Sequence, residues 1–197
     1  MNQSDTISAT LDRREAVPAV LGRHEDFLII TGLAGAAQDI AEITQEADNT
    51  FMLGGAMGGA AMMGLGLALA QPDRHVLVVT GDGDLLMSLG ALATIGAQAP
   101  TNLSILCIDN ARYGETGNQQ THTAKGIDLA SVAKACNFTT VMNVTSQNQL
   151  PAAKDALREP GPVFVLLGVT DGPSRRYRRN WDAVERKLIF RRALIEK

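Results

Sequence analysis

The sequence is poor in the features that mark several protein classes. It has only two cysteines, Cys107 and Cys136, too few and too far apart for a metal site built on closely spaced thiols. Cys107 lies inside an apolar run, which favours a buried thiol and fits a reducing cytoplasm. The first residues do not read as a signal peptide, and glycines interrupt every long apolar stretch, so we expect a cytoplasmic protein without a membrane segment. A net charge of −3 argues against nucleic acid as the main partner.

What the sequence does contain is the composition of a globular protein. Apolar residues make up 45% of the 197 positions and charged residues 20%, enough for one domain with a full core. Strand-like runs alternate with helical patterns, which predicts an α/β fold with a doubly wound parallel sheet and helices on both faces. We expect a disordered tail over 1–9, the domain over 10–170 and a basic arm or helix over 171–197.

The chain is organised around one strand–helix–strand unit. An apolar run over 76–80 precedes Gly81-Asp82-Gly83, and after a helical pattern a second run over 103–108 ends in Asp109-Asn110. Because the carboxyl ends of parallel strands meet at one edge of a sheet, Asp82 and Asn110 should converge. Their oxygens suit Mg²⁺ holding a phosphate group, which the glycines would let approach the backbone. The alternative is an ordinary unit whose polar ends are accidental.

This unit resembles the signature of thiamine diphosphate (ThDP) enzymes, in which an asparagine at a strand end follows Gly-Asp-Gly after about 25 to 30 residues. The resemblance implies that Mg²⁺ is held by Asp82, Asn110 and the backbone carbonyl of Arg112. The family usually has asparagine where this chain has Asp109, and often a small residue where it has Asp84. Since a second carboxylate repels phosphate unless it points away or is protonated, Asp84 is expected beside the cofactor but not as a metal ligand.

The resemblance extends to two further stretches. In a G-x-Met-G element, Met57 corresponds to the apolar residue that props ThDP into its reactive bent shape, a catalytic role. The run YGETG…THT over 113–123 looks like that of sulfopyruvate and phosphonopyruvate decarboxylases. His122 is a second catalytic candidate, while Thr31 and Gly32 either contact the diphosphate or only form a turn. The residues expected at the cofactor are Thr31, Gly32, Gly55, Ala56, Met57, Gly81, Asp82, Gly83, Asp84, Asn110, Tyr113, Gly114 and Glu115.

Two polar segments allow more than one interpretation. The aperiodic run over 114–126 is expected to form a flap over the cofactor, and the alternative is a solvated loop with a surface histidine. Its Asn118, Gln119, His122 and Lys125 are available to bind a sulfonate or phosphonate. The segment from residue 174 contains seven arginines. A solvated helix is its default interpretation, and an arm that grips an acidic partner or an anionic substrate is the alternative.

The resemblance covers residues 10–170, which correspond to one of the two domains of a ThDP site. It implies a separate pyrimidine-binding (α) subunit that supplies the activating glutamate, in a hetero-oligomer whose contact includes the apolar surface over 54–66. The implied reaction is decarboxylation of a small 2-oxo acid to CO₂ and an aldehyde, with ThDP and Mg²⁺. The alternatives are the small subunit of an acetolactate synthase-like carboligase or of a 2-oxo acid oxidoreductase, and a non-catalytic phosphate-binding module.

Overall fold

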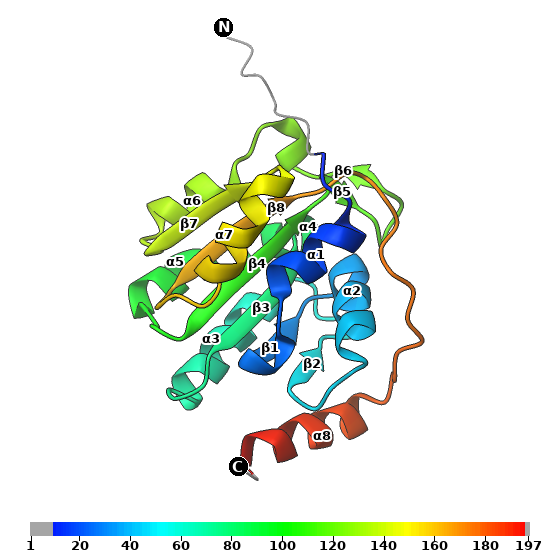
Figure 1. The fold of residues 1–197 in the computed structure, drawn as a ribbon, viewed down its shortest axis with the longest axis vertical. Coiled ribbons are helices and arrows are strands. Elements are labelled where there is room, and N and C mark those ends of the chain that lie inside the picture. Colours follow the sequence, from blue (N-terminus) through cyan, green and yellow to red (C-terminus); the bar gives the residue numbers. More distant parts are fainter. Residues whose placement is uncertain (1–9, 196–197) are drawn as a thin grey trace, which may run out of the picture.

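The computed structural model describes residues 10–195, whose centre is a six-stranded parallel sheet with helices on both faces (Figure 1). The strand order is β2-β1-β3-β4-β8-β7, and every neighbouring pair is parallel. This confirms the predicted doubly wound α/β fold. The strands are β1 (Leu28–Thr31), β2 (Thr50–Met52), β3 (Val76–Gly81), β4 (Leu103–Asp109), β7 (Thr140–Val144) and β8 (Val163–Gly168).

The helices divide between the two faces of the sheet. One buried cluster includes residues of α1 (Arg13–Leu21), α2 (Ala34–Thr44) and α7 (Leu150–Ala156). The other includes residues of α3 (Ala60–Ala70), α5 (Ala91–Gln98) and α6 (Leu129–Ala135). Short 3₁₀ turns, η1 (His24–Asp26) and η3 (Gln147–Gln149), precede β1 and α7. None of the helices between residues 10 and 195 is long and apolar enough to span a membrane.

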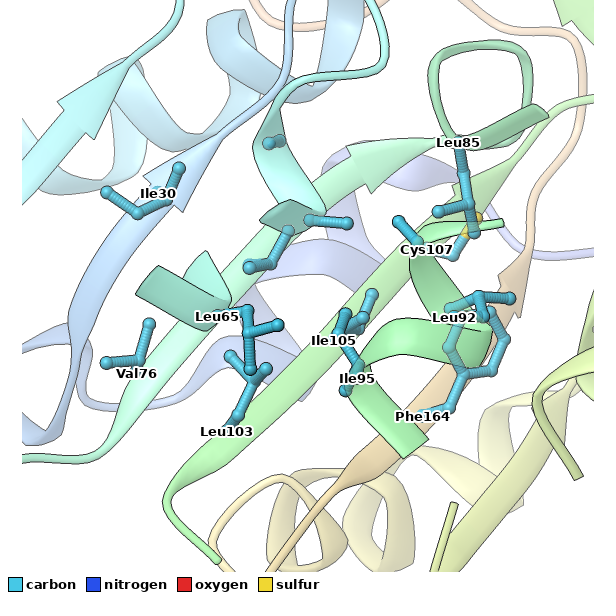
Figure 2. Packing of buried hydrophobic residues seen from close by; sticks show 14 of the residues in the cluster. Ile30, Leu65, Val76, Leu85, Leu92, Ile95, Leu103, Ile105, Cys107 and Phe164 are labelled. Carbon is cyan, nitrogen blue, oxygen red and sulfur yellow. The ribbon is translucent and has the colours of Figure 1, made fainter. Parts of the chain in front are cut away.

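Successive residues of the central strands supply the two clusters alternately. Val76 and Val78 belong to the cluster with α3 and α5, whereas Leu77 and Val79 belong to the cluster with α1 and α2. This follows from the two-residue repeat of a strand, which points neighbouring side chains to opposite faces. Figure 2 shows the cluster with α3 and α5, in which Cys107 of β4 is fully buried, as expected. Burial is the main cause that raises the pKa of its thiol.

Two local expectations differ from the structure. The helix expected after Gly81-Asp82-Gly83 is divided into α4 (Asp82–Leu86) and α5, with Gly90, a poor helix former, in the interval. The expected flap contains an antiparallel hairpin of β5 (Arg112–Tyr113) and β6 (Gln119–Gln120), followed by the 3₁₀ turn η2 (Thr123–Lys125). Its turn places Gly117 at φ 133° and Asn118 at φ 62°. Strands of two residues are too short to show a sequence period.

The C-terminal segment is only partly the solvated helix of the default interpretation. Its first part is packed against the domain, and its final helix is mostly exposed but buries Arg186 and Phe190. We use the term arm for residues 170–182, which run without regular helix along α2 before α8 (Ala183–Ile195) lies against β2 (Figure 1). The backbone N–H of Asn180 donates to the Glu46 carboxylate at 2.9 Å, and the Arg186 guanidinium donates to the carbonyl of Thr50 at 2.9 Å. The tail expected over 1–9 lies outside the described residues.

Candidate active site

A cavity of about 530 Å³ lies at the carboxyl edge of the sheet. Its walls come from the ends of β3 and β4, the first turn of α2, the β5–β6 hairpin, the loop before α3 and the arm. The structure therefore brings together most of the residues expected from the sequence. Those that line the cavity are Met57, Gly81, Asp82, Gly83, Asp84, Asn110, Arg112, Tyr113, Gly114 and Glu115.

The other expected residues lie off the cavity wall. Thr31 is fully buried and its hydroxyl donates to the carbonyl of Gly32 at 3.0 Å. Gly32 lies behind the wall, since a Cβ there would come within 1.8 Å of Asp84 Oδ2, and the turn instead presents Leu33, Ala34 and Gly35. Gly55 and Ala56 are exposed beside the wall, and His122 is exposed with Nδ1 3.5 Å from the Tyr113 hydroxyl.

Two acidic side chains meet at the ends of β3 and β4. The register pairs Gly81 with Ile108, so Asp82 and Asp109 follow at neighbouring positions. Asp82 is only 1% exposed, and its Oδ2 accepts a hydrogen bond from Thr121 Oγ1 at 2.6 Å. Thr123 Oγ1 lies 2.8 Å from Asp109 Oδ1. Burial, and then the charge of Asp109, raise the pKa of Asp82 to about 7. A bound divalent cation would offset both causes.

The neighbouring groups add neutral oxygen donors and a bare stretch of backbone. Asn110 lines the cavity, and its Oδ1 accepts the backbone N–H of Arg112 at 3.3 Å across a turn in which Ala111 has φ 58°. Among residues 10–195, no cluster of three or more His, Cys, Asp and Glu could hold a metal. A metal site here therefore needs amide and carbonyl oxygens beside Asp82, the donor set that suits Mg²⁺. At Gly81 an added Cβ would find its nearest atom 3.9 Å away, so the backbone is open to a ligand.

The second carboxylate of the Gly-Asp-Gly-Asp run has a different arrangement. Asp84 Oδ1 accepts the backbone N–H of Gly58 at 2.6 Å, and Oδ2 accepts the Thr80 hydroxyl at 2.6 Å. Asp84 thus joins the end of β3 to the loop that carries Met57, which lines the cavity and is 36% exposed. Each of its two oxygens accepts one of these hydrogen bonds.

Sequence reasoning missed two groups of residues at this site. Thr121 and Thr123 contact the acidic pair, and their only sequence signal was the THT run in the resemblance. Arg176, Arg179 and Trp181 of the arm line the cavity. The basic composition had allowed an arm that grips an anionic substrate as an alternative, but it did not indicate which residues would reach the site. Of the four polar loop residues considered for an anionic substrate, only Asn118 lines the cavity.

Residues 34–167 match the model of the family described as thiamine pyrophosphate enzyme, C-terminal TPP binding domain, where TPP is another name for ThDP. The chain belongs to this family, as the sequence predicted. It is 40% identical to sulfopyruvate decarboxylase subunit beta of Methanothermobacter thermautotrophicus, over 82% of this chain and 84% of that protein. It is also 47% identical to phosphonopyruvate decarboxylase of Streptomyces viridochromogenes, over 64% of this chain but 31% of that protein.

Solved structures agree with this assignment at the level of the fold. A putative thiamin diphosphate-dependent enzyme from Mycobacterium smegmatis superposes with a TM-score of 0.65 at 22% identity, covering 84% of this chain and 33% of that one. Benzoylformate decarboxylase from Polynucleobacter necessarius superposes with a TM-score of 0.63 at 18% identity, covering 89% of this chain and 36% of that one. At such low identity the likeness defines the fold alone.

Proposed function

We propose that this chain is the diphosphate- and Mg²⁺-binding subunit of a ThDP-dependent decarboxylase. Its substrate is a small 2-oxo acid related to sulfopyruvate or phosphonopyruvate, and its products are CO₂ and an aldehyde. The observation that supports this best is the meeting of Asp82, Asn110 and Arg112 on one cavity wall. The same chain is 40% identical to a protein named as a sulfopyruvate decarboxylase subunit.

Each residue of the wall has a definite role in this proposal. Asp82, Asn110 and the carbonyl of Arg112 hold Mg²⁺, and the open backbone at Gly81 approaches the diphosphate. Thr121 fixes the orientation of Asp82 through its 2.6 Å hydrogen bond, and Met57 supports the bent cofactor. When bound, ThDP supplies the electron sink that accepts the pair left by departing CO₂.

A separate α subunit completes the site in this proposal. The relatives from Methanothermobacter and Methanocaldococcus, of which this chain covers 84% and 71%, are both named as beta subunits. Glu42 and Glu46 contact Arg175 and Asn180 of the arm, so neither is free to activate the aminopyrimidine. In this proposal the activating glutamate comes from the partner, and Glu115, which lines the cavity, is the alternative within this chain. Large exposed apolar side chains on and near α3, such as Met62, Met63 and Met87, fit a hetero-oligomer contact.

The test is a reconstitution with sulfopyruvate, ThDP and Mg²⁺. This chain and a candidate α subunit are assayed separately and mixed, with CO₂ and aldehyde measured. We expect turnover only in the mixture, together with formation of a complex in sedimentation. Robust turnover by this chain alone would contradict the split site and point to Glu115, a glutamate that lines the cavity.

The carboligase and oxidoreductase alternatives predict other products from the same mixture. A carboligase would release CO₂ and join the remaining fragment to a second carbonyl compound, and an oxidoreductase would need an electron acceptor. The oxidoreductase reading has some support, because 2-oxoglutarate synthase subunit KorB of Methanocaldococcus jannaschii is 30% identical over 73% of this chain. Product analysis with and without an acceptor separates the three reactions.

A further inference from the structure

The arm lines part of the cavity and lies outside the family model, which ends at residue 167. It contributes Arg176 and Arg179, together with Asp171, whose carboxylate is paired with Arg112 at 3.4 Å. Its backbone is fixed to α2 by hydrogen bonds from the N–H of Arg175 to Asp39 Oδ1 at 3.0 Å and from the N–H of Tyr177 to Gln38 Oε1 at 3.2 Å. Arg176, which lies between these two anchored residues, and Arg179, which follows them, both line the cavity. The arm is therefore positioned well enough to present a specific side chain.

Arg179 differs from the other buried arginines of the structure. It is 8% exposed, and no residue between 10 and 195 forms a hydrogen bond or ion pair with its guanidinium; its Nε is buried without a partner, as is the Nε of Arg186. By contrast, Arg13 is paired with Asp39 at 2.7 Å, and Arg186 donates to two backbone carbonyls. The side chain of Arg179 lies over the ring of Trp181, 4.6 Å from the guanidinium carbon to the ring centroid.

The buried Nε of Arg179 has lost water without gaining a hydrogen bond, which is costly, whereas the residue as a whole lines the cavity. Burial is the first cause that lowers the pKa of Arg179, although the carboxylates of Glu46 and Glu115 oppose the shift from a distance. A bound oxyanion would remove this cost, since the planar guanidinium donates two parallel hydrogen bonds to a carboxylate, sulfonate or phosphonate.

Arg179 and the proposed Mg²⁺ ligands are carried by different elements of the structure. Trp181 Cζ3 is 4.0 Å from the position that a Cβ on Gly54 would occupy, so the Arg179–Trp181 pair borders the loop of Met57. Asp82 and Asn110 lie instead at the ends of the strands. Arg179 and the proposed Mg²⁺ ligands thus come from different segments that line the same cavity.

We propose that Arg179, assisted by Arg176, binds the sulfonate or phosphonate group of the substrate and that the arm determines substrate specificity. This builds on the decarboxylase function proposed above. The loop residues first considered for this role fit it less well, because Gln119, His122 and Lys125 are exposed and do not line the cavity.

The first test measures binding without catalysis and uses the single tryptophan of the chain, Trp181, as the reporter. Sulfoacetate and acetate are titrated into the full-length chain alone, with Trp181 fluorescence recorded. We expect saturable binding of sulfoacetate but not of acetate, and Arg179→Gln should weaken it about 10- to 100-fold, as expected for a charge-assisted hydrogen-bonded pair. Arg178→Gln is the matched control, since Arg178 is exposed on the same arm and does not line the cavity. Equal affinity in Arg179→Gln would overturn the proposal.

The second test uses the assembled enzyme and compares sulfopyruvate with pyruvate. Arg179→Gln should lower kcat/KM for sulfopyruvate at least about tenfold more than for pyruvate. ThDP affinity should stay within about twofold, and Arg179→Lys should restore part of the loss because it returns the charge. Equal losses on both substrates, weaker ThDP binding or loss of the α subunit would assign Arg179 to another role. If wild-type enzyme decarboxylates no 2-oxo acid, the proposed function fails, while the fluorescence titration still decides the anion site.

Discussion

The acidic wall and the basic wall of the cavity are built in opposite ways. In the acidic wall, Asp82, Asp84 and Asp109 already accept hydrogen bonds from hydroxyl groups or backbone amides, and they come from two neighbouring strand ends. In the basic wall, Arg179 has no hydrogen-bond or ion-pair partner among the described residues, and the arm that carries it is packed on α2. The first wall has an excess of negative charge that a cation would balance, and the second an excess of positive charge that an anion would balance. This difference indicates two ligand positions of opposite charge in one cavity.

Removing the acidic wall should have the largest effect. Asp82→Ala deletes an inner-sphere oxygen of the proposed Mg²⁺ site, so we expect Mg²⁺-dependent ThDP affinity to fall more than about 100-fold, beyond the range seen for outer-shell residues. Calorimetry on the assembled enzyme, with and without Mg²⁺, measures this change. Asp73→Ala replaces an exposed aspartate and is the control. Unchanged ThDP affinity in Asp82→Ala would show that the acidic wall does not hold the metal.

The next largest effect is expected from Asp39, which anchors the arm, and it is measured as a change in the free energy of unfolding. Asp39 is fully buried and accepts from Arg13 Nη2 at 2.7 Å and from the backbone N–H of Arg175. Asp39→Ala leaves the Arg13 charge buried and uncompensated, so the free energy of unfolding should fall by about 3–5 kcal/mol. Urea unfolding measures the loss, and Trp181 fluorescence reports whether the arm is released.

The control for the arm anchor is a more exposed ion pair. Asp26 and Arg158 are 2.9 Å apart but partly exposed, so Asp26→Ala should cost about 1 kcal/mol or less. Similar losses in the two variants would mean that the Arg13–Asp39 pair is not a specific anchor.

A third substitution tests whether the loop of Met57 affects the conformation of bound ThDP or the affinity for ThDP. Met57→Ala should lower kcat about 10- to 100-fold through poorer positioning, while ThDP binding is largely kept. Asp84→Ala should give the same signature, since it removes the acceptor for the Gly58 N–H and the Thr80 hydroxyl. Val184→Ala, which shortens an exposed apolar side chain on α8 away from the cavity, is the control. Loss of ThDP binding in Asp84→Ala, with kcat unchanged at saturation, would make Asp84 a cofactor ligand.

The two walls also differ in how far the sequence could predict them. Asp82 and Asn110 follow adjacent parallel strands, and the topology of such sheets brings those ends together whatever the details of packing. Thr31 and Gly32 were expected at the cofactor from the family resemblance, with a simple turn as the alternative. The resemblance does not say which residue of the turn faces the cavity, and here Leu33 to Gly35 do.

Long-range contacts limited the prediction of the basic wall. Arg179 reaches the cavity because Asp39, Gln38 and Glu46, all on or just after α2, bind the backbone of the arm. An extended segment without a hydrophobic period gives no sign of such anchors. Thr121 was missed for a related reason, since it follows a hairpin whose strands have two residues each. Composition alone indicated a basic segment, and only the structure shows which of its arginines is enclosed.

The smallest expected effect is that of replacing Thr121, which donates a hydrogen bond to the proposed metal ligand Asp82. Thr121 is 1% exposed and donates to Asp82 Oδ2, so Thr121→Val keeps the shape but leaves that oxygen without its closest donor. We expect Mg²⁺ affinity to fall about tenfold, the lower end for outer-shell partners of a metal ligand, while Thr121→Ser retains most of it.

Thr139→Val is the control for Thr121→Val, since Thr139 donates to the carbonyl of Pro162 and does not line the cavity. Titration of Mg²⁺ at fixed ThDP, followed by enzyme activity and by calorimetry, distinguishes the variants. If Thr121→Val binds Mg²⁺ as tightly as wild type, the orientation of Asp82 does not depend on Thr121, and its backbone and the longer 3.3 Å hydrogen bond from Thr123 suffice. The hairpin that precedes Thr121 would then serve to close the cavity rather than to support the metal site.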